Sequence, residues 1–214
     1  MTERRELISG LARELSPVPW WRRPAAVAWL WAATSVLFVV AASTLIQPWR
    51  PVFARQLLSA PAFALEVVLA LAGFGVILWL GFRSAVPAAV RSRHALALGV
   101  LAFLPWLALL LYGLWQPALE PSMLGKRAAC YLEVLLLGTP PLLLGLGLCR
   151  GLYPLQRWTT GALLGAAAGM IPGVAMQMAC MYIVPHGLTH HVLPIAGTTM
   201  AGAVLGVLVL CPPR

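Results

Sequence analysis

The sequence predicts an all-α, polytopic membrane protein, a bundle of six transmembrane helices with a short cytoplasmic amphipathic helix at the N-terminus. Hydrophobic residues make up 61% of the chain and charged residues 10%, whereas soluble domains carry about 25% charged residues. Its longest apolar runs exceed the roughly 20 residues that cross a ~30 Å hydrocarbon core. The alternating ten-residue segments of a membrane β-barrel are not visible in it.

The first element is a helix outside the membrane, predicted over residues 2–16 and ended by Pro17 and Pro19. Its apolar residues recur at helical spacing on one face, with charged residues opposite. Mixed charge fits a protein partner better than a lipid surface, which favours an all-basic face. Packing on the inner membrane surface or on the chain's own loops are the alternatives. The candidate partner-binding residues are Leu7, Ile8, Leu11 and Leu15, with Arg5 and Glu14.

The remaining chain divides into spans joined by short loops. We therefore separate a cytoplasmic N-terminal segment, residues 1–24, from a transmembrane domain, residues 25–214. A kink is expected in the fourth span at Pro140 and Pro141. The predicted spans cover about 25–46, 61–82, 95–115, 128–149, 158–182 and 188–210.

The distribution of positive charge predicts the orientation of the bundle. With both termini in the cytoplasm, eleven of the fifteen Lys and Arg residues fall in inner segments. The four in outer loops are Arg50, Arg55, Lys126 and Arg127. The positive-inside rule therefore favours placing both termini in the cytoplasm.

Glycine recurs every four residues in the fifth span and again in the sixth. A helix face without side chains lets a second backbone approach closely, so we expect these glycines to pack the bundle. The sequence leaves open whether the partner helix belongs to the same chain or to a second copy, and so whether the protein is a homo-oligomer. The glycines are Gly161, Gly165, Gly169, Gly173, Gly202 and Gly206.

The outer end of the bundle gathers the residues that carry chemistry. A disulfide between Cys130 and Cys180 is one interpretation, and a transition-metal site is another, because thiolates and imidazoles suit zinc, cadmium or copper. The third interpretation is simple packing of polar side chains. The two intramembrane carboxylates are functional candidates because a charge in hydrocarbon costs several kcal/mol. The sensing candidates are Cys130, Cys180, His186, His191, Glu66 and Glu133, and the metal ligands among them are Cys130, Cys180, His186 and His191.

Two functional classes find no support in the sequence. No Walker loop, His-Glu-x-x-His, Gly-x-Ser-x-Gly or Cys-x-x-Cys motif occurs, so we expect no catalytic residues and no enzyme. The net charge of +9 reflects loop arginines, not a basic stripe with aromatic residues, so no direct nucleic-acid binding is expected. A small metal or solute permease with its entry site at the outer cluster stays open, as does a membrane assembly subunit.

Four local patterns resemble the NrsF-type six-span membrane anti-sigma factors of proteobacteria. The segment from Glu6 to Val18 resembles that family's N-terminal helix, and Pro61 to Glu66 resembles the start of its second span. Cys130 followed by Pro140-Pro141 resembles the fourth span. The fifth-to-sixth turn resembles the family in Cys180-Met181-Tyr182, His186, His191 and Pro194, with Gly202 and Gly206 beyond.

The resemblance implies a regulator that holds an ECF-type sigma factor at the membrane until a stress signal arrives. It also implies that Cys130 and Cys180 respond to heavy metals or oxidants. The family pattern leads us to expect an acidic residue shortly after Tyr182, and this chain has Ile183-Val184 instead. A carboxylate ligand would then have to come from Glu66 or Glu133.

Overall fold

The computed structural model describes residues 5–6, 8–10 and 23–211. Within this part the chain forms six helical segments that are long and apolar enough to span a membrane, as the sequence predicts. The last of them is assembled from three consecutive pieces. The elements are α2 (Pro24–Ile46), α3 (Phe53–Ser59), α4 (Pro61–Ser84), α5 (Ser92–Tyr112), α6 (Cys130–Arg150), α7 (Arg157–Ala179), α8 (Val184–Gly187), the π-helical turn η2 (Leu188–Val192) and α9 (Leu193–Val209).

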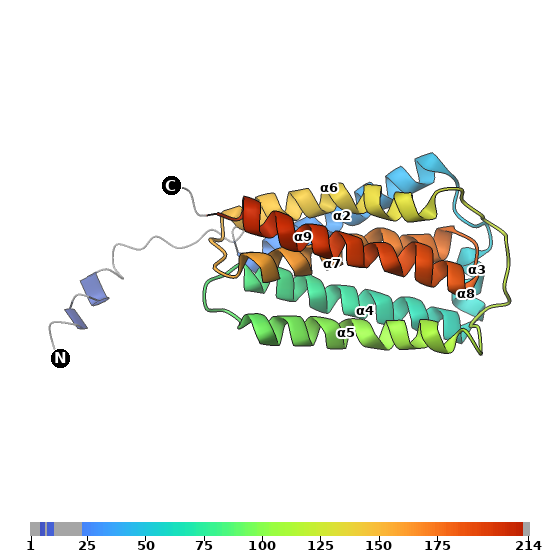
Figure 1. Cartoon of the computed structure of the whole chain (residues 1–214), viewed down its shortest axis with the longest axis horizontal. Helices are drawn as coiled ribbons and strands as arrows, with labels where there is room; N and C mark the ends of the chain where they lie inside the picture. The colour runs from blue at the N-terminus through green and yellow to red at the C-terminus, as the bar shows by residue number, and fades with distance from the viewer. Residues whose placement is uncertain (1–4, 7, 11–22, 212–214) are drawn as a thin grey trace.

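The spans lie side by side and alternate in direction, so their ends form two opposite faces of the bundle (Figure 1). We call the face that holds Ile46, Cys130 and Ala179 the cysteine end, and α3 and α8 lie there. The face that holds Ser92 and Arg157 is called the basic end. Each of the two faces therefore collects loops that are far apart in the sequence.

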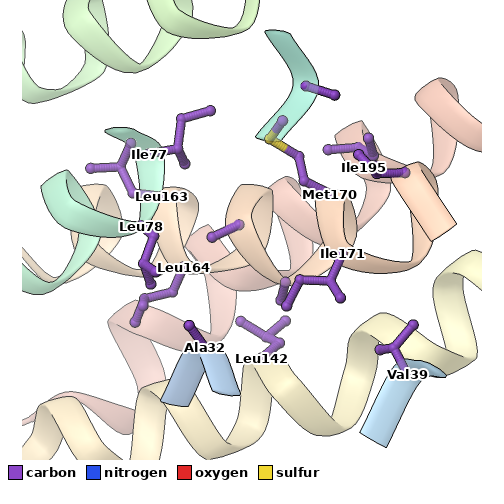
Figure 2. Packing of buried hydrophobic residues seen from close by; sticks show 14 of the residues in the cluster. Ala32, Val39, Ile77, Leu78, Leu142, Leu163, Leu164, Met170, Ile171 and Ile195 are labelled. Carbon is purple, nitrogen blue, oxygen red and sulfur yellow. The ribbon is translucent and has the colours of Figure 1, made fainter. Parts of the chain in front are cut away.

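Helix α7 is the centre of the bundle. In its most apolar stretch 89% of the residues are buried, against 22% in α5, which lies at the edge (Figure 1). Figure 2 shows Leu164 and Ile171 of α7 among Ala32 of α2, Leu78 of α4 and Leu142 of α6. A movement of α7 would therefore change the packing of most of the other spans.

The glycines of α7 face α9 within the same chain. A Cβ atom on Gly161 would meet the carbonyl oxygen of Gly202, and one on Gly165 would meet that of Thr198. Gly173 lies opposite the backbone of His191, where an added Cβ would be 3.0 Å from the carbonyl oxygen. The structure thus pairs the two glycine-bearing spans with each other, the arrangement that small-xxx-small faces permit.

The spans differ from the predicted boundaries mainly at the cysteine end. The fifth ends at Ala179, not at Tyr182, because Tyr182 is in extended backbone that forms an antiparallel bridge with Ser122. The sixth begins at Val184, about four residues early, because Pro185 opens a helical turn where His186 had indicated a loop. The loop after the first span contains the short helix α3, which the sequence analysis did not foresee.

The predicted cytoplasmic helix lies mostly outside the described residues. Leu7, Leu11, Glu14 and Leu15 are among the residues that are not described. Residues 5–6 and 8–10 are helical, with Arg5 and Ile8 both exposed.

Candidate functional site

Two cysteines from separate spans meet at the cysteine end. Cys130 is the first residue of α6, and Cys180 directly follows the last residue of α7. Their sulfur atoms lie 2.7 Å apart, and both side chains are buried. Met181 packs against the pair. This contact joins the start of α6 to the end of the central helix.

The sixth span supplies two histidines to the same place. The Nε2 atom of His186 lies 3.5 Å from Cys180 Sγ, and the rings of His186 and His191 are 5.2 Å apart. Residues five apart diverge in an α-helix, but the π-turn η2 closes an i to i+5 hydrogen bond from Leu193 N–H to Leu188 C=O. The wider turn brings the two imidazoles to one side of the segment.

The four residues form a compact set of soft and borderline ligands. The candidate ligand atoms of Cys130, Cys180, His186 and His191 all lie within 4.8 Å of one another. His191 is buried, and its Nε2 atom has no hydrogen-bond partner. Two sulfurs and two imidazole nitrogens are a donor set for tetrahedral zinc and its heavier relatives. A metal ion would give the orphaned nitrogen a partner.

The same sulfur pair also suits oxidation. Two sulfurs on one tetrahedral zinc lie about 3.7 Å apart, given Zn–S bonds of about 2.3 Å, and a disulfide bond measures about 2.05 Å. The observed separation of 2.7 Å falls between these values. Moving apart by about 1 Å admits a metal, and moving together by less than that forms the disulfide. Each event would exclude the other.

Cys180 is the more acidic partner of the pair. A hydrogen bond from Cys130 lowers the pKa of the Cys180 thiol, and His191 lowers it further, against the opposing effect of burial. The thiolate is the form that binds metals and attacks oxidants. Cys180 is therefore the group on which either reaction would begin.

A buried arginine fixes the backbone of Cys180. Arg50 donates from Nη1 to the carbonyl oxygen of Cys180 at 3.0 Å and from Nη2 to that of Gln177 at 3.4 Å. Its guanidinium lies over the ring of Phe63, 5.6 Å from the centroid. Burial lowers the pKa of Arg50, but a guanidinium keeps its charge in proteins. Arg50 therefore holds a positive charge at the C-terminus of α7, where the helix dipole favours a cation.

The two carboxylates lie next to the four-residue cluster without joining it. Glu66 of α4 accepts hydrogen bonds from Gln177 Nε2 at 2.7 Å and from the Tyr182 hydroxyl at 3.2 Å. Burial is the main cause that raises the pKa of Tyr182, so this hydroxyl keeps its proton and donates. Glu66 thus ties α4 to the segment on either side of Cys180.

Glu133 forms an ion pair with Arg127, with Nη2 and Oε2 2.8 Å apart. Arg127 also donates to the carbonyl oxygens of Ser43 at 2.9 Å and Gln47 at 2.7 Å, at the C-terminus of α2. The pair therefore fastens the start of α6 to the end of α2. Each carboxylate already has its partners, so the four-residue cluster is the set of candidate ligands that the structure brings together.

Sequence reasoning named the cysteines and histidines but missed the residues that position them. Arg50 and Arg127 were counted only as outer-loop charges, although both are buried. Their occurrence in loops that should be poor in positive charge was the available signal. Gln177 and Tyr182 carried no comparable signal, because both act through hydrogen bonds to Glu66, which is more than a hundred residues away along the chain.

Comparison with known proteins identifies a family that the chain matches. A family model described as NrsF, negative regulator of sigma F, matches residues 11–211, nearly the whole chain. No curated protein and no solved structure matches the chain.

Proposed function

This chain belongs to the NrsF family of negative regulators of sigma F, and we propose that it is a membrane-bound anti-sigma factor for an ECF-type sigma factor. In this proposal it holds the sigma factor at the bacterial inner membrane and releases it under metal or oxidant stress. The family is a family of regulators, not of enzymes. The observation that carries the sensing part is the compact cluster of Cys130, Cys180, His186 and His191.

The input to the sensor takes one of two forms. A zinc, cadmium or copper ion would bind the two thiolates and the two imidazoles, releasing the thiol protons. With a peroxide as the oxidant, the Cys180 thiolate attacks an oxygen atom and becomes a sulfenic acid while hydroxide leaves. The Cys130 thiol then displaces water to complete the disulfide. Both reactions change the distance between the start of α6 and the end of α7.

The position of α7 supports transmission of that change. Cys180 directly follows α7, and α7 packs against α2, α4, α6 and α9 along its length. A change at its cysteine end therefore biases the packing of the spans whose loops lie at the basic end. A coupling of about 1–3 kcal/mol would change partner occupancy about 5–150-fold. No large rearrangement is needed for release.

The sigma factor would bind on the cytoplasmic side, which the positive-inside rule assigns to the basic end. The helix predicted over residues 2–16 would lie with its apolar face in a groove of the partner, the helix-in-groove mode. The loops at residues 83–94 and 150–157 would add exposed arginines to this surface. The loop at residues 83–94 joins α4 to α5, which both pack on α7, and the loop at residues 150–157 leads directly into α7.

The test is affinity purification of the tagged protein from membranes of its host in mild detergent, followed by mass spectrometry. A variant with Leu7→Asp and Leu11→Asp removes the apolar face of the helix, and a variant with Ser9→Asp adds charge on the opposite face as a control. We expect a sigma factor with wild type and with the control, and its loss with the double variant. A sigma factor retained by the double variant would overturn the assignment of the helix. Recovery of integral membrane proteins alone would overturn the proposed function.

A further inference from the structure

An apolar groove runs along the surface of the bundle between α5 and α9. Its volume is about 590 Å³. Helix α5 packs mainly on α4 and less on α7, so a gap remains between α5 and α9, with mostly buried residues of α7 at its floor. Small residues keep the groove open: Gly99 on α5, Ala162 and Ala166 on α7, and Ala196 on α9. The groove therefore lies within the hydrocarbon region and opens toward the lipid.

The length and lining of the groove suit an acyl chain. From Leu96 to Leu111 the α5 wall is about 22 Å long at 1.5 Å per residue. Apart from Thr199 the lining side chains are apolar. An unbranched methylene chain, which the surrounding lipid supplies at this depth, can lie along such a groove.

Charge at one mouth of the groove selects the head group. Arg93 is exposed and lies one helical turn before Leu96, the groove residue nearest the start of α5. Arg157, which is half-buried and donates from Nη1 to Cys211 Sγ at 3.2 Å, is the first residue of α7. A hydrogen bond of 2.7 Å from Ser92 Oγ to Gln156 Oε1 holds the starts of α5 and α7 together. Within residues 23–211 every carboxylate belongs to the cysteine end. Two arginines beside two helix N-termini favour an anion.

We propose that this groove binds one acyl chain of an anionic phospholipid from the leaflet at the basic end, with its phosphate beside Arg93 and Arg157. Half of a ~30 Å hydrocarbon core is about 15 Å, so a chain entering there fills about two thirds of the groove. The inference is independent of sigma-factor binding, because it rests on the groove and its charged mouth alone.

Native mass spectrometry of the detergent-purified full chain, titrated with phosphatidylglycerol or with phosphatidylcholine, tests the groove. The variant Ala196→Phe fills it from an exposed position, and Ala201→Phe makes the same change on α9 outside the lining. We expect one phosphatidylglycerol to stay bound to wild type and to Ala201→Phe and to be lost from Ala196→Phe. If Ala196→Phe fails to fold, Ala196→Leu tests the same point with a smaller side chain.

The head-group part is tested by Arg93→Gln, with Arg55→Gln at the opposite end as the charge-matched control. We expect Arg93→Gln to lower the preference for phosphatidylglycerol over phosphatidylcholine about fivefold and Arg55→Gln to leave it unchanged. Equal retention of the two lipids by wild type, or equal retention by Ala196→Phe and Ala201→Phe, would show ordinary surface lipid only and overturn the proposal. A dimer that Ala196→Phe dissociates would assign the groove to a second copy instead.

Discussion

The two ends of this bundle use arginine in opposite ways. At the basic end Arg91, Arg93 and Arg150 are exposed. At the cysteine end Arg50 and Arg127 are buried and donate to backbone carbonyls at the C-termini of α7 and α2. The exposed arginines are free to set orientation and to meet lipid or a partner. The buried ones hold helix ends in place around the cysteine pair.

This difference indicates where stability and where regulation reside. The cysteine end is a connected network of ion pair, hydrogen bonds and reactive thiols, so a local chemical change there must be shared with several helices. At the basic end Arg91, Arg93 and Arg150 are exposed, so exchanging one partner for another costs little free energy. The predictions below test this contrast, beginning with the largest expected effect.

Removing Arg127 should destabilise the protein most. Arg127→Met leaves the buried Glu133 carboxylate unpaired and the end of α2 without its donor, a change that costs about 3–5 kcal/mol. Thermal unfolding in detergent measures it, and Arg150→Met, an exposed arginine at the basic end, is the matched control. The control should stay within about 0.5 kcal/mol of wild type. Equal loss from both variants would contradict the contrast between the ends.

The contact between α7 and α9, which runs between the two ends of the bundle, should be the next most sensitive to substitution. In Gly165→Ala the added Cβ meets the backbone of Thr198, so α7 and α9 must separate, at a cost of about 1–3 kcal/mol. Gly147 of α6 has open space around it, and Gly147→Ala should be neutral or stabilising by up to about 1 kcal/mol. The same unfolding assay should therefore show a loss of stability for Gly165→Ala and none for Gly147→Ala. A Gly165→Ala protein as stable as wild type would show that α7 and α9 are not closely packed.

A metal-binding experiment should distinguish His191, a proposed ligand, from its neighbour His190. Cadmium bound to thiolates absorbs in the ultraviolet, so a titration of the reduced protein reports affinity. His191→Ala removes one of four ligands and should weaken binding by about tenfold or more. His190 is half-buried, stacks on His186 and lies outside the four-ligand set. His190→Ala should therefore bind cadmium nearly as wild type does, and equal weakening would remove His191 from the site.

The sequence predicts those features that repeat or that local composition determines. Long apolar runs fixed the number of spans, and four-residue glycine spacing marked the faces that α7 and α9 bring together. Cys130 and Cys180 could be placed at one end because each is close to a span boundary. Their contact at 2.7 Å still depends on loop conformations that no periodicity encodes.

What escaped prediction depends on long-range hydrogen bonds. Arg127 has the same local context as a topology-setting loop residue, and only its contacts with α2 distinguish it. The π-turn that aligns His186 with His191 has no strong sequence pattern. Glu66 was expected near the thiols as a possible ligand, and it lies instead against Gln177 and Tyr182. These partners are more than a hundred residues away along the chain.

The most direct measurement is release of the sigma factor from the purified complex in lipid nanodiscs after addition of cadmium or peroxide. Wild type and Cys211→Ser, which alters an exposed cysteine at the basic end, should release the sigma factor with either inducer. Cys130→Ser and Cys180→Ser should bind it equally well and retain it when the inducer is added. Release from the two serine variants at the wild-type level would contradict a sensor built on this cysteine pair.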